Sequence, residues 1–126
     1  RGSWRRQHEP TLLPGGTLLV FDNLSVRERS AVIELDPLTG EELWVYRPDG
    51  LERFFSSGCG TCQRLPNGNT LVTVSNSGRA FEVTPAGERV WEWLSPYRSG
   101  ADPELVATLF DVHRLPPDYG ADWLGR

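Results

Sequence analysis

Hydrophobic and polar residues alternate in short runs along most of the chain, and residues that favour turns separate these runs. Alternation with a period of two is typical of β-strands that bury one face. The pattern predicts eight strands, near Glu9–Leu13, Thr17–Phe21, Ala31–Leu35, Glu42–Tyr46, Thr61–Leu65, Asn69–Val74, Ala80–Val83 and Val90–Trp93. Proline and glycine stand together in the turns between them, so the chain is predicted to be all-β.

The first half of the chain recurs in the second half. Residues Thr11–Val20 return as Gln63–Val72, and Glu34–Trp44 return as Glu82–Trp91. A period of about 50 residues with four short strands in each unit is typical of β-propeller blades. We therefore expect two four-stranded blades, followed by the start of a third blade at His113–Pro116.

This repeat suggests a division of the chain. Residues 1–6 are interpreted as a tag remnant or a flexible N-terminus, 7–58 as one blade, 59–95 as the next, and 96–126 as the inner strand of a further blade with a tail. We expect that inner strand over Leu105–Leu115 and an anchor at Trp123-Leu124. Two blades cannot close a ring, since propellers typically need about 4–8. The chain is thus expected to be a piece of a longer polypeptide or to form a homo-oligomer.

Aromatic and apolar residues outside the strand cores are assigned to the space between blades. The linker over Pro48–Gly58 is predicted to fill this interface with Leu51, Phe54 and Phe55. The tryptophans at matched outer-strand positions, Trp44, Trp91 and Trp93, are predicted to pack there as well.

Charge and composition exclude several classes of function. The net charge is −4 and the chain has no long basic segment, which argues against nucleic-acid binding. It contains no lysine, so Schiff-base and P-loop chemistry are excluded within these residues. Its apolar runs are too short to span a bilayer, and no membrane association is expected.

Two cysteines form a single C-x-x-C pattern at Cys59 and Cys62. Three alternatives stay open: a local disulfide, a pair of free thiols, or a zinc site completed by His8 and His113. Because a structural zinc site normally shows four ligands with paired spacing, no metal and no cofactor are predicted.

Three phrases carry a resemblance to a known family: Gln7–Pro10 ahead of Phe21–Asn23, then Gln63–Leu71, then Gly78–Pro85. Together they resemble the C-terminal portion of the bacterial arylsulfotransferases, over roughly Gln7 to Leu124. The resemblance implies a six-bladed propeller that transfers a sulfuryl group between phenols through a transient sulfohistidine. It also implies phenolic or sulfated small molecules as partners, and a periplasmic or extracellular location.

The same resemblance implies candidate site residues. His8 matches a family histidine, and Arg27 is the first match for the arginine that follows Phe-Asp-Asn, with Arg29 second. Asn23 and His113 are expected to help bind the substrate. An imidazole is a competent nucleophile near pH 7, and a guanidinium can hold two sulfate oxygens.

This sequence also departs from the family pattern. Glu9 replaces an aspartate, Leu24 replaces a glycine, and the Cys59–Cys62 strand has no histidine. When the repeats are aligned on Leu13, Leu65 and Leu115, His8 occupies the same position in its inner strand as Gly60 and Phe110 occupy in theirs. A non-catalytic propeller scaffold or assembly module is therefore the alternative interpretation.

Overall fold

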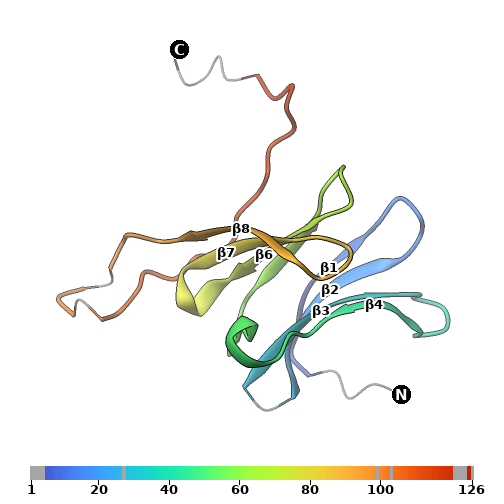
Figure 1. The fold of residues 1–126 in the computed structure, drawn as a ribbon, viewed down its shortest axis with the longest axis horizontal. Helices are drawn as coiled ribbons and strands as arrows, with labels where there is room; N and C mark the ends of the chain where they lie inside the picture. Colours follow the sequence, from blue (N-terminus) through green and yellow to red (C-terminus); the bar gives the residue numbers. More distant parts are fainter. Residues whose placement is uncertain (1–4, 27, 99, 103, 121–124, 126) are drawn as a thin grey trace.

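The computed structural model describes residues 5–26, 28–98, 100–102, 104–120 and 125, and Figure 1 shows how they are arranged. Three sequence predictions fall wholly or partly on other residues. Arg27, the Trp123-Leu124 anchor and most of the proposed N-terminal extension lie outside the described residues.

The described residues form two four-stranded antiparallel sheets and no α-helix. The first sheet has the order β1-β2-β3-β4, and the second has the order β5-β6-β7-β8. Their bounds are β1 Gln7–Leu12, β2 Leu18–Val26, β3 Arg29–Leu35, β4 Glu42–Tyr46, β5 Thr61–Arg64, β6 Thr70–Val74, β7 Arg79–Val83 and β8 Arg89–Leu94. The all-β prediction is confirmed, and sheets of four consecutive antiparallel strands are compatible with propeller blades.

The repeated sequence forms the same turn in the first hairpin of each sheet. In the first sheet Leu13 N–H donates to Thr17 O at 2.8 Å, and in the second sheet Leu65 N–H donates to Asn69 O at 2.8 Å. The turn glycines Gly16 and Gly68 have φ of 85° and 87°, a left-handed conformation that glycine adopts without steric cost. One difference from the predicted pattern lies at the other end of the first sheet, where β2 continues to Val26 and β3 begins at Arg29.

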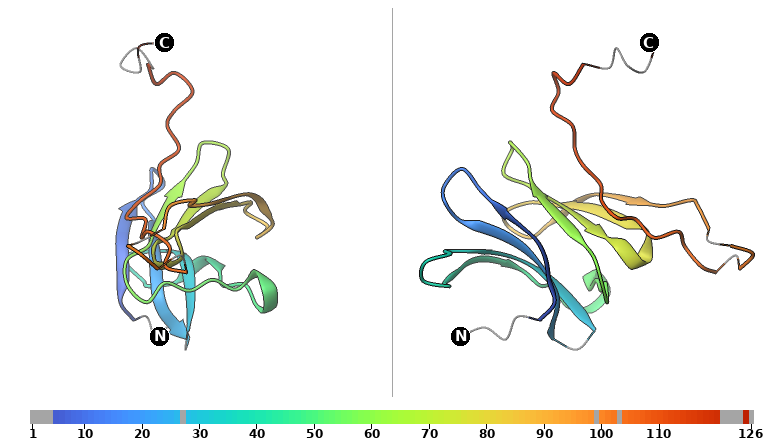
Figure 2. Two further views of the ribbon diagram at one scale, coloured as in Figure 1. Left: turned by 90° about the vertical axis from the view of Figure 1, so that its left-hand side faces the viewer. Right: turned by 180° about the vertical axis from the view of Figure 1, so that it is seen from behind.

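The two sheets face one another across the main hydrophobic core. This core joins residues of both sheets with one linker residue: Leu19, Phe21, Val32, Tyr46, Phe54, Cys62, Val72, Val74, Phe81 and Val83. Figure 2 shows the sheets spreading apart from the side on which β1 and β5 lie. Inner strands that lie together while the sheets diverge are what a radial arrangement of blades requires.

The linker fills this interface only in part. Phe54 is 3% exposed, and its ring lies between Phe21, Tyr46 and Phe81 at centroid distances of 5.3–5.9 Å. Phe55 is half-buried. The prediction for Leu51 is wrong, because its side chain is 100% exposed on the short 3-10 helix η1 (Gly50–Glu52), which turns it away from the core.

An arginine, a glutamate and a tryptophan make the same contact twice. Arg64 pairs with Glu34 at 2.9 Å, and its guanidinium lies 5.0 Å from the Trp44 ring centre. In the next unit Arg114 pairs with Glu82 at 2.8 Å and lies 5.0 Å from the Trp91 ring centre. The C-terminal segment therefore meets the second sheet as β5 meets the first.

That segment nevertheless forms no strand over Leu105–Leu115, and this prediction is wrong. The described part of it makes one isolated bridge, between Arg98 and Val106. Further along, it is held by side chains of the second sheet: Val112 N–H donates to Thr73 Oγ1 at 3.1 Å, and Arg114 N–H to Gln63 Oε1 at 2.8 Å. The reason is that it crosses the face of the second sheet, where no strand of the described residues lies beside it to offer backbone partners.

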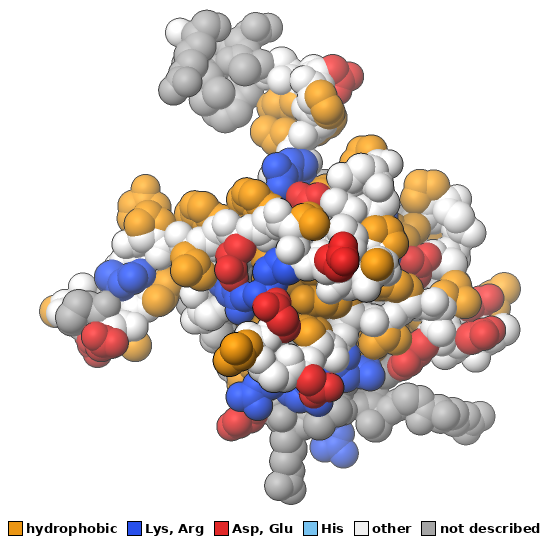
Figure 3. All heavy atoms as spheres, in the orientation of Figure 1, with side chains coloured by type: hydrophobic (Ala, Val, Ile, Leu, Met, Phe, Trp, Pro, Cys, Tyr) orange, Lys and Arg blue, Asp and Glu red, His pale blue; other side chains and the backbone are white. Residues whose placement is uncertain are grey.

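The surface shows charge of both signs. On the face drawn in Figure 3, arginine side chains lie among aspartate and glutamate side chains, and hydrophobic groups gather along the upper edge over β8 and the residues after it. Among the described residues, no helix has the length and hydrophobicity needed to cross a membrane.

Candidate functional site

A β-bulge near the start of β1 sets the direction of His8. His8 pairs with Phe21 and Thr11 pairs with Leu19, so Glu9 and Pro10 together face a single residue of β2. Proline, which cannot donate to the ladder, is tolerated at such a bulge. The extra residue shifts the alignment of the repeats by one. In the structure the counterpart of His8 is Thr61, which pairs with Thr73, so the prediction that His8 corresponds to Gly60 is wrong.

His8 lies between the two sheets with both ring nitrogens engaged. Its Nδ1 is 2.6 Å from Asn23 Oδ1 and 3.1 Å from the carbonyl oxygen of Arg6. Its Nε2 is 3.3 Å from the backbone nitrogen of Cys59. Two acceptors at Nδ1 and a donor at Nε2 fit the neutral ring that carries its proton on Nδ1.

Asn23 is the residue that fixes this tautomer. Its side chain is fully buried, at 0% exposure, and its amide nitrogen donates to Ser56 O at 2.7 Å and to Cys59 O at 2.6 Å. These two bonds leave Oδ1 as the only group that can meet the imidazole, so it must accept the Nδ1 proton. Asn23 therefore joins β2, the linker and His8 in one network.

The loop in front of His8 has an unusual backbone. Cys59 has a φ of 56°, which is uncommon for a residue with a side chain, and Gly60 has a φ of 123°. A Cβ atom at Gly60 would lie 2.5 Å from the Phe21 ring. Glycine is required at this position because the backbone passes directly over that ring. This close approach places the Cys59 N–H at His8 Nε2.

Of the two arginines predicted to bind sulfate, the structure describes only Arg29. Arg27 lies outside the described residues. Arg29 Nη2 forms an ion pair with Asp49 at 2.7 Å and donates to the carbonyl oxygens of Arg47 and Pro48, both at 3.2 Å. In this state the Arg29 guanidinium holds the start of the linker.

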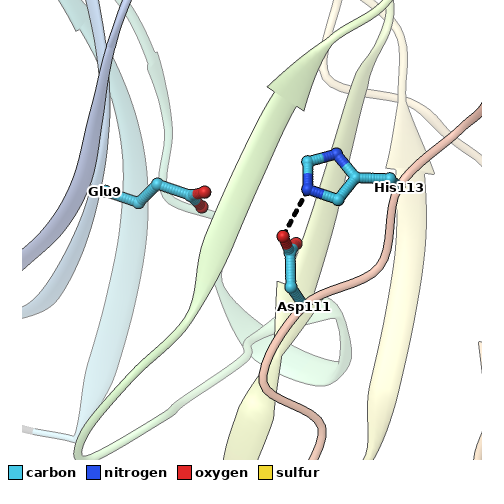
Figure 4. Close-up of side chains that lie close together, drawn as sticks. All are labelled: Glu9, Asp111 and His113. Atoms are coloured by element: carbon cyan, nitrogen blue, oxygen red, sulfur yellow. Dashed lines mark ion pairs between the residues drawn. The ribbon is translucent and has the colours of Figure 1, made fainter.

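His113 lies in a second cluster, which Figure 4 shows. Its Nε2 forms an ion pair with Asp111, and Glu9 from β1 points toward both side chains. One ligand-type atom from each of the three residues lies within 4.8 Å of the others, and all three residues are exposed. Thr61 Oγ1 also donates to Asp111 Oδ1 at 2.6 Å. The structure thus separates His113 from the partners of His8.

The pKa of Glu9 is raised from its ordinary value. Desolvation is the larger cause, and the neighbouring Asp111 carboxylate adds to it, whereas His113 and a hydrogen bond from the Cys62 backbone oppose it. Sequence reasoning did not single out Glu9 and Asp111 as a site. A signal was present in the sequence, because alignment on Leu13 and Leu115 places Glu9 and Asp111 at matching positions of the first and third units, although the bulge at Glu9-Pro10 shifts that alignment by one residue.

Both cysteines are free thiols. Cys62 is buried in the core, where desolvation and then the nearby Glu9 raise its pKa far above the ordinary range. Cys59 is half-buried beside His8. Among the described residues, the group that could hold a metal contains neither cysteine.

Comparison with known proteins gives one family. The family model described as "Arylsulfotransferase (ASST)" matches residues 1–99, which include both sheets, His8 and Asn23. Searches of curated proteins and of solved structures found no match. Because the family model matches more than half of the sequence, the chain belongs to the arylsulfotransferase family.

Proposed function

We propose that this chain is part of an arylsulfotransferase that moves a sulfuryl group between phenols, with His8 as the nucleophile. The observation that carries the proposal is the hydrogen bond from His8 Nδ1 to Asn23 Oδ1 at 2.6 Å, within a chain of this family. It keeps the Nε2 lone pair free of a proton. The single described bond to Nε2, from Cys59 N–H, is long at 3.3 Å and can be displaced by a substrate.

The reaction would proceed in two steps, transfer of the sulfuryl group to His8 and then transfer to the acceptor phenol. Nε2 attacks the sulfur of an aryl sulfate, an N–S bond forms, and the S–O bond to the aryl group breaks as the phenol leaves and takes up a proton. The oxygen of an acceptor phenol then attacks the same sulfur, the N–S bond breaks, and the acceptor loses its proton. Asn23 would stabilise the positive charge that develops on the ring in the first step.

The other residues predicted for the site would bind the substrate or position His8. Arg27 would bind the sulfate oxygens, because guanidinium groups neutralise charge on such oxygens in a fork geometry. Arg29 could do so only by releasing the linker carbonyls that it now binds. His113 would assist substrate binding, and Asn23 would act as a positioning residue, since its buried amide already has its partners within the protein. We place the enzyme in the periplasm or outside the cell, on the resemblance to its family.

A transfer assay with 4-nitrophenyl sulfate as donor and phenol as acceptor tests this function. We expect His8→Ala to abolish release of 4-nitrophenol. Asn23→Asp keeps an acceptor at Nδ1 but loses the two amide N–H donors to Ser56 O and Cys59 O, so it should lower both the stability of the fold and kcat. His113→Ala is the matched histidine control and should mainly raise KM.

The alternative is a non-catalytic scaffold. It would be supported if the unaltered chain released no more nitrophenol than a protein-free blank and did not bind aryl sulfate. Release above the blank that His8→Ala leaves unchanged would instead contradict the role given to His8. The proposal fails under either result.

A further inference from the structure

We propose that Glu9, Asp111 and His113 form a binding site for a divalent transition-metal cation of the zinc type. One imidazole nitrogen and two carboxylate oxygens lie within 4.8 Å of one another and come from two distant parts of the chain. Figure 4 shows the three side chains directed at a common point between β1 and the C-terminal segment. Among the described residues this cluster shares no hydrogen-bond partner with the His8 ring, and the inference holds whether or not His113 also contacts a sulfuryl donor.

The backbone that carries two of the ligands is held in place. Asp111 and His113 are alternate residues of an extended segment and therefore project to the same side. Hydrogen bonds from Val112 N–H to Thr73 and from Arg114 N–H to Gln63 fix the segment to the second sheet within this stretch. Both side chains are thus presented to the cation by a backbone that needs no rearrangement.

Neighbouring hydrogen bonds also orient the ligands. Thr61 Oγ1 donates to Asp111 Oδ1 at 2.6 Å and leaves Oδ2, the oxygen that now meets His113, to face the site. The β-bulge at Glu9, where φ is 47°, turns the third carboxylate toward the same point. Outer hydrogen bonds of this kind are common around metal ligands.

The charges favour a cation over a purely internal ion pair. Two carboxylates face a single imidazole, and among the described residues Glu9 belongs to no ion pair with an arginine. The set therefore keeps a net negative charge even when His113 is protonated. A divalent cation bound by the two carboxylates and the imidazole would balance these charges more closely.

The donor set indicates which ion would bind. Zinc accepts imidazole nitrogen and carboxylate oxygen together, and sites with three protein ligands complete the coordination with water. Calcium and magnesium favour sites made of oxygen alone. Because all three side chains are exposed, water has access and the side chains can close the remaining distance.

The test uses the full chain after removal of metals. We expect isothermal titration with Zn²⁺ to show one site, with Ca²⁺ giving no comparable heat, and Co²⁺ to bind with an absorption spectrum that lacks a thiolate charge-transfer band. Glu9→Gln and His113→Ala should each weaken Zn²⁺ binding at least about tenfold, as loss of one ligand of three would. Glu88→Gln, at an exposed glutamate of a distant turn, is the matched control and should leave binding unchanged.

Two results would overturn the proposal. One is a Co²⁺ spectrum with thiolate bands that disappears in Cys59→Ser, because the ion would then sit on the cysteine. The other is Zn²⁺ affinity that stays the same in Glu9→Gln and His113→Ala. Circular dichroism of each variant would establish that it is folded before these affinities are compared.

Discussion

Asn23 is the polar centre of the space between the two sheets. Its fully buried side chain bonds to the carbonyl oxygens of Ser56 and Cys59 and to the ring of His8. A buried amide that meets all of these groups stabilises the fold, and it also sets the proton position on the imidazole. Asn23 therefore links the packing between the sheets to the tautomer of His8.

Asn23→Ala should lower the free energy of unfolding by about 2–3 kcal/mol, because it leaves two buried carbonyl groups without their donor. Urea denaturation followed by fluorescence would measure this change. Asn76→Ala is a fitting comparison: Asn76 accepts from Ser56 Oγ and Gly58 N–H but is exposed, so water can replace it at a cost of about 1 kcal/mol or less. Equal losses in the two variants would contradict the central place given to Asn23.

The two thiols should differ sharply in reactivity. Cys62 is 5% exposed and its pKa is raised, so it stays protonated and inaccessible at pH 8, whereas Cys59 lies half-buried on the loop before β5. Brief treatment of the native protein with iodoacetamide, followed by peptide mass mapping, should find the label on Cys59 and nearly none on Cys62. Labelling of Cys62 at a similar rate would show that the core opens readily.

Among the elements, the Cys59-Gly60 corner controls how the second sheet meets the first. Gly60→Ala would place a methyl group 2.5 Å from the Phe21 ring on a backbone with positive φ. We expect a loss of about 3 kcal/mol or more, since strain and overpacking add. Thermal unfolding monitored by circular dichroism would measure it.

Gly16→Ala separates these two causes. Gly16 also has positive φ, at 85°, but a Cβ atom there would meet nothing within 4 Å. Its loss should be limited to the backbone term of about 1–2 kcal/mol. If both alanine variants lost the same amount, contact with Phe21 would not be the reason for Gly60.

The repeated arginine contact makes a second prediction for the elements. Arg64→Ala removes the partner of Glu34 and the cation over Trp44, at the interface between the sheets. We expect a loss of about 2 kcal/mol for this partly buried group. Arg114→Ala breaks the same contact in a more exposed setting and should cost about 1 kcal/mol or less, as surface pairs do. Chemical denaturation of both variants would test this order.

Most elements could be predicted from the sequence because period-two alternation and turn residues act locally. The positions of the eight strands follow from those signals. The position of His8 does not, because the bulge at Glu9-Pro10 adds one residue that no repeat alignment shows. The sequence also could not show that Leu105–Leu115 forms no strand. A strand needs a backbone partner, and only the three-dimensional arrangement supplies one.

In the whole molecule, the second sheet covers part of the outer strand of the first sheet, whereas the corresponding surface of the second sheet is exposed. Tyr46 of β4 is 5% exposed, whereas Trp93 at the matching position of β8 is 37% exposed. Trp44 donates from its ring nitrogen to Pro85 O across the interface, and this confirms its predicted packing between the sheets. The open face of β8 is what a further blade would cover.

We therefore propose that further copies of the chain cover this face. Light scattering on the purified chain should find a mass above that of one copy, with a trimer as the species that gives six blades. Trp93→Glu should shift the mass toward one copy, because it places a charge where apolar contact is needed. A monomer at high concentration for the unaltered chain would contradict self-association.

If one imidazole carries the sulfuryl group during transfer, peptide mass mapping after incubation with 4-nitrophenyl sulfate should detect the group there. We expect a mass increase of one SO₃ group on the peptide that contains His8, and its loss when a phenol acceptor is added. Modification at another residue, or an unmodified His8 peptide while nitrophenol is released, would contradict it.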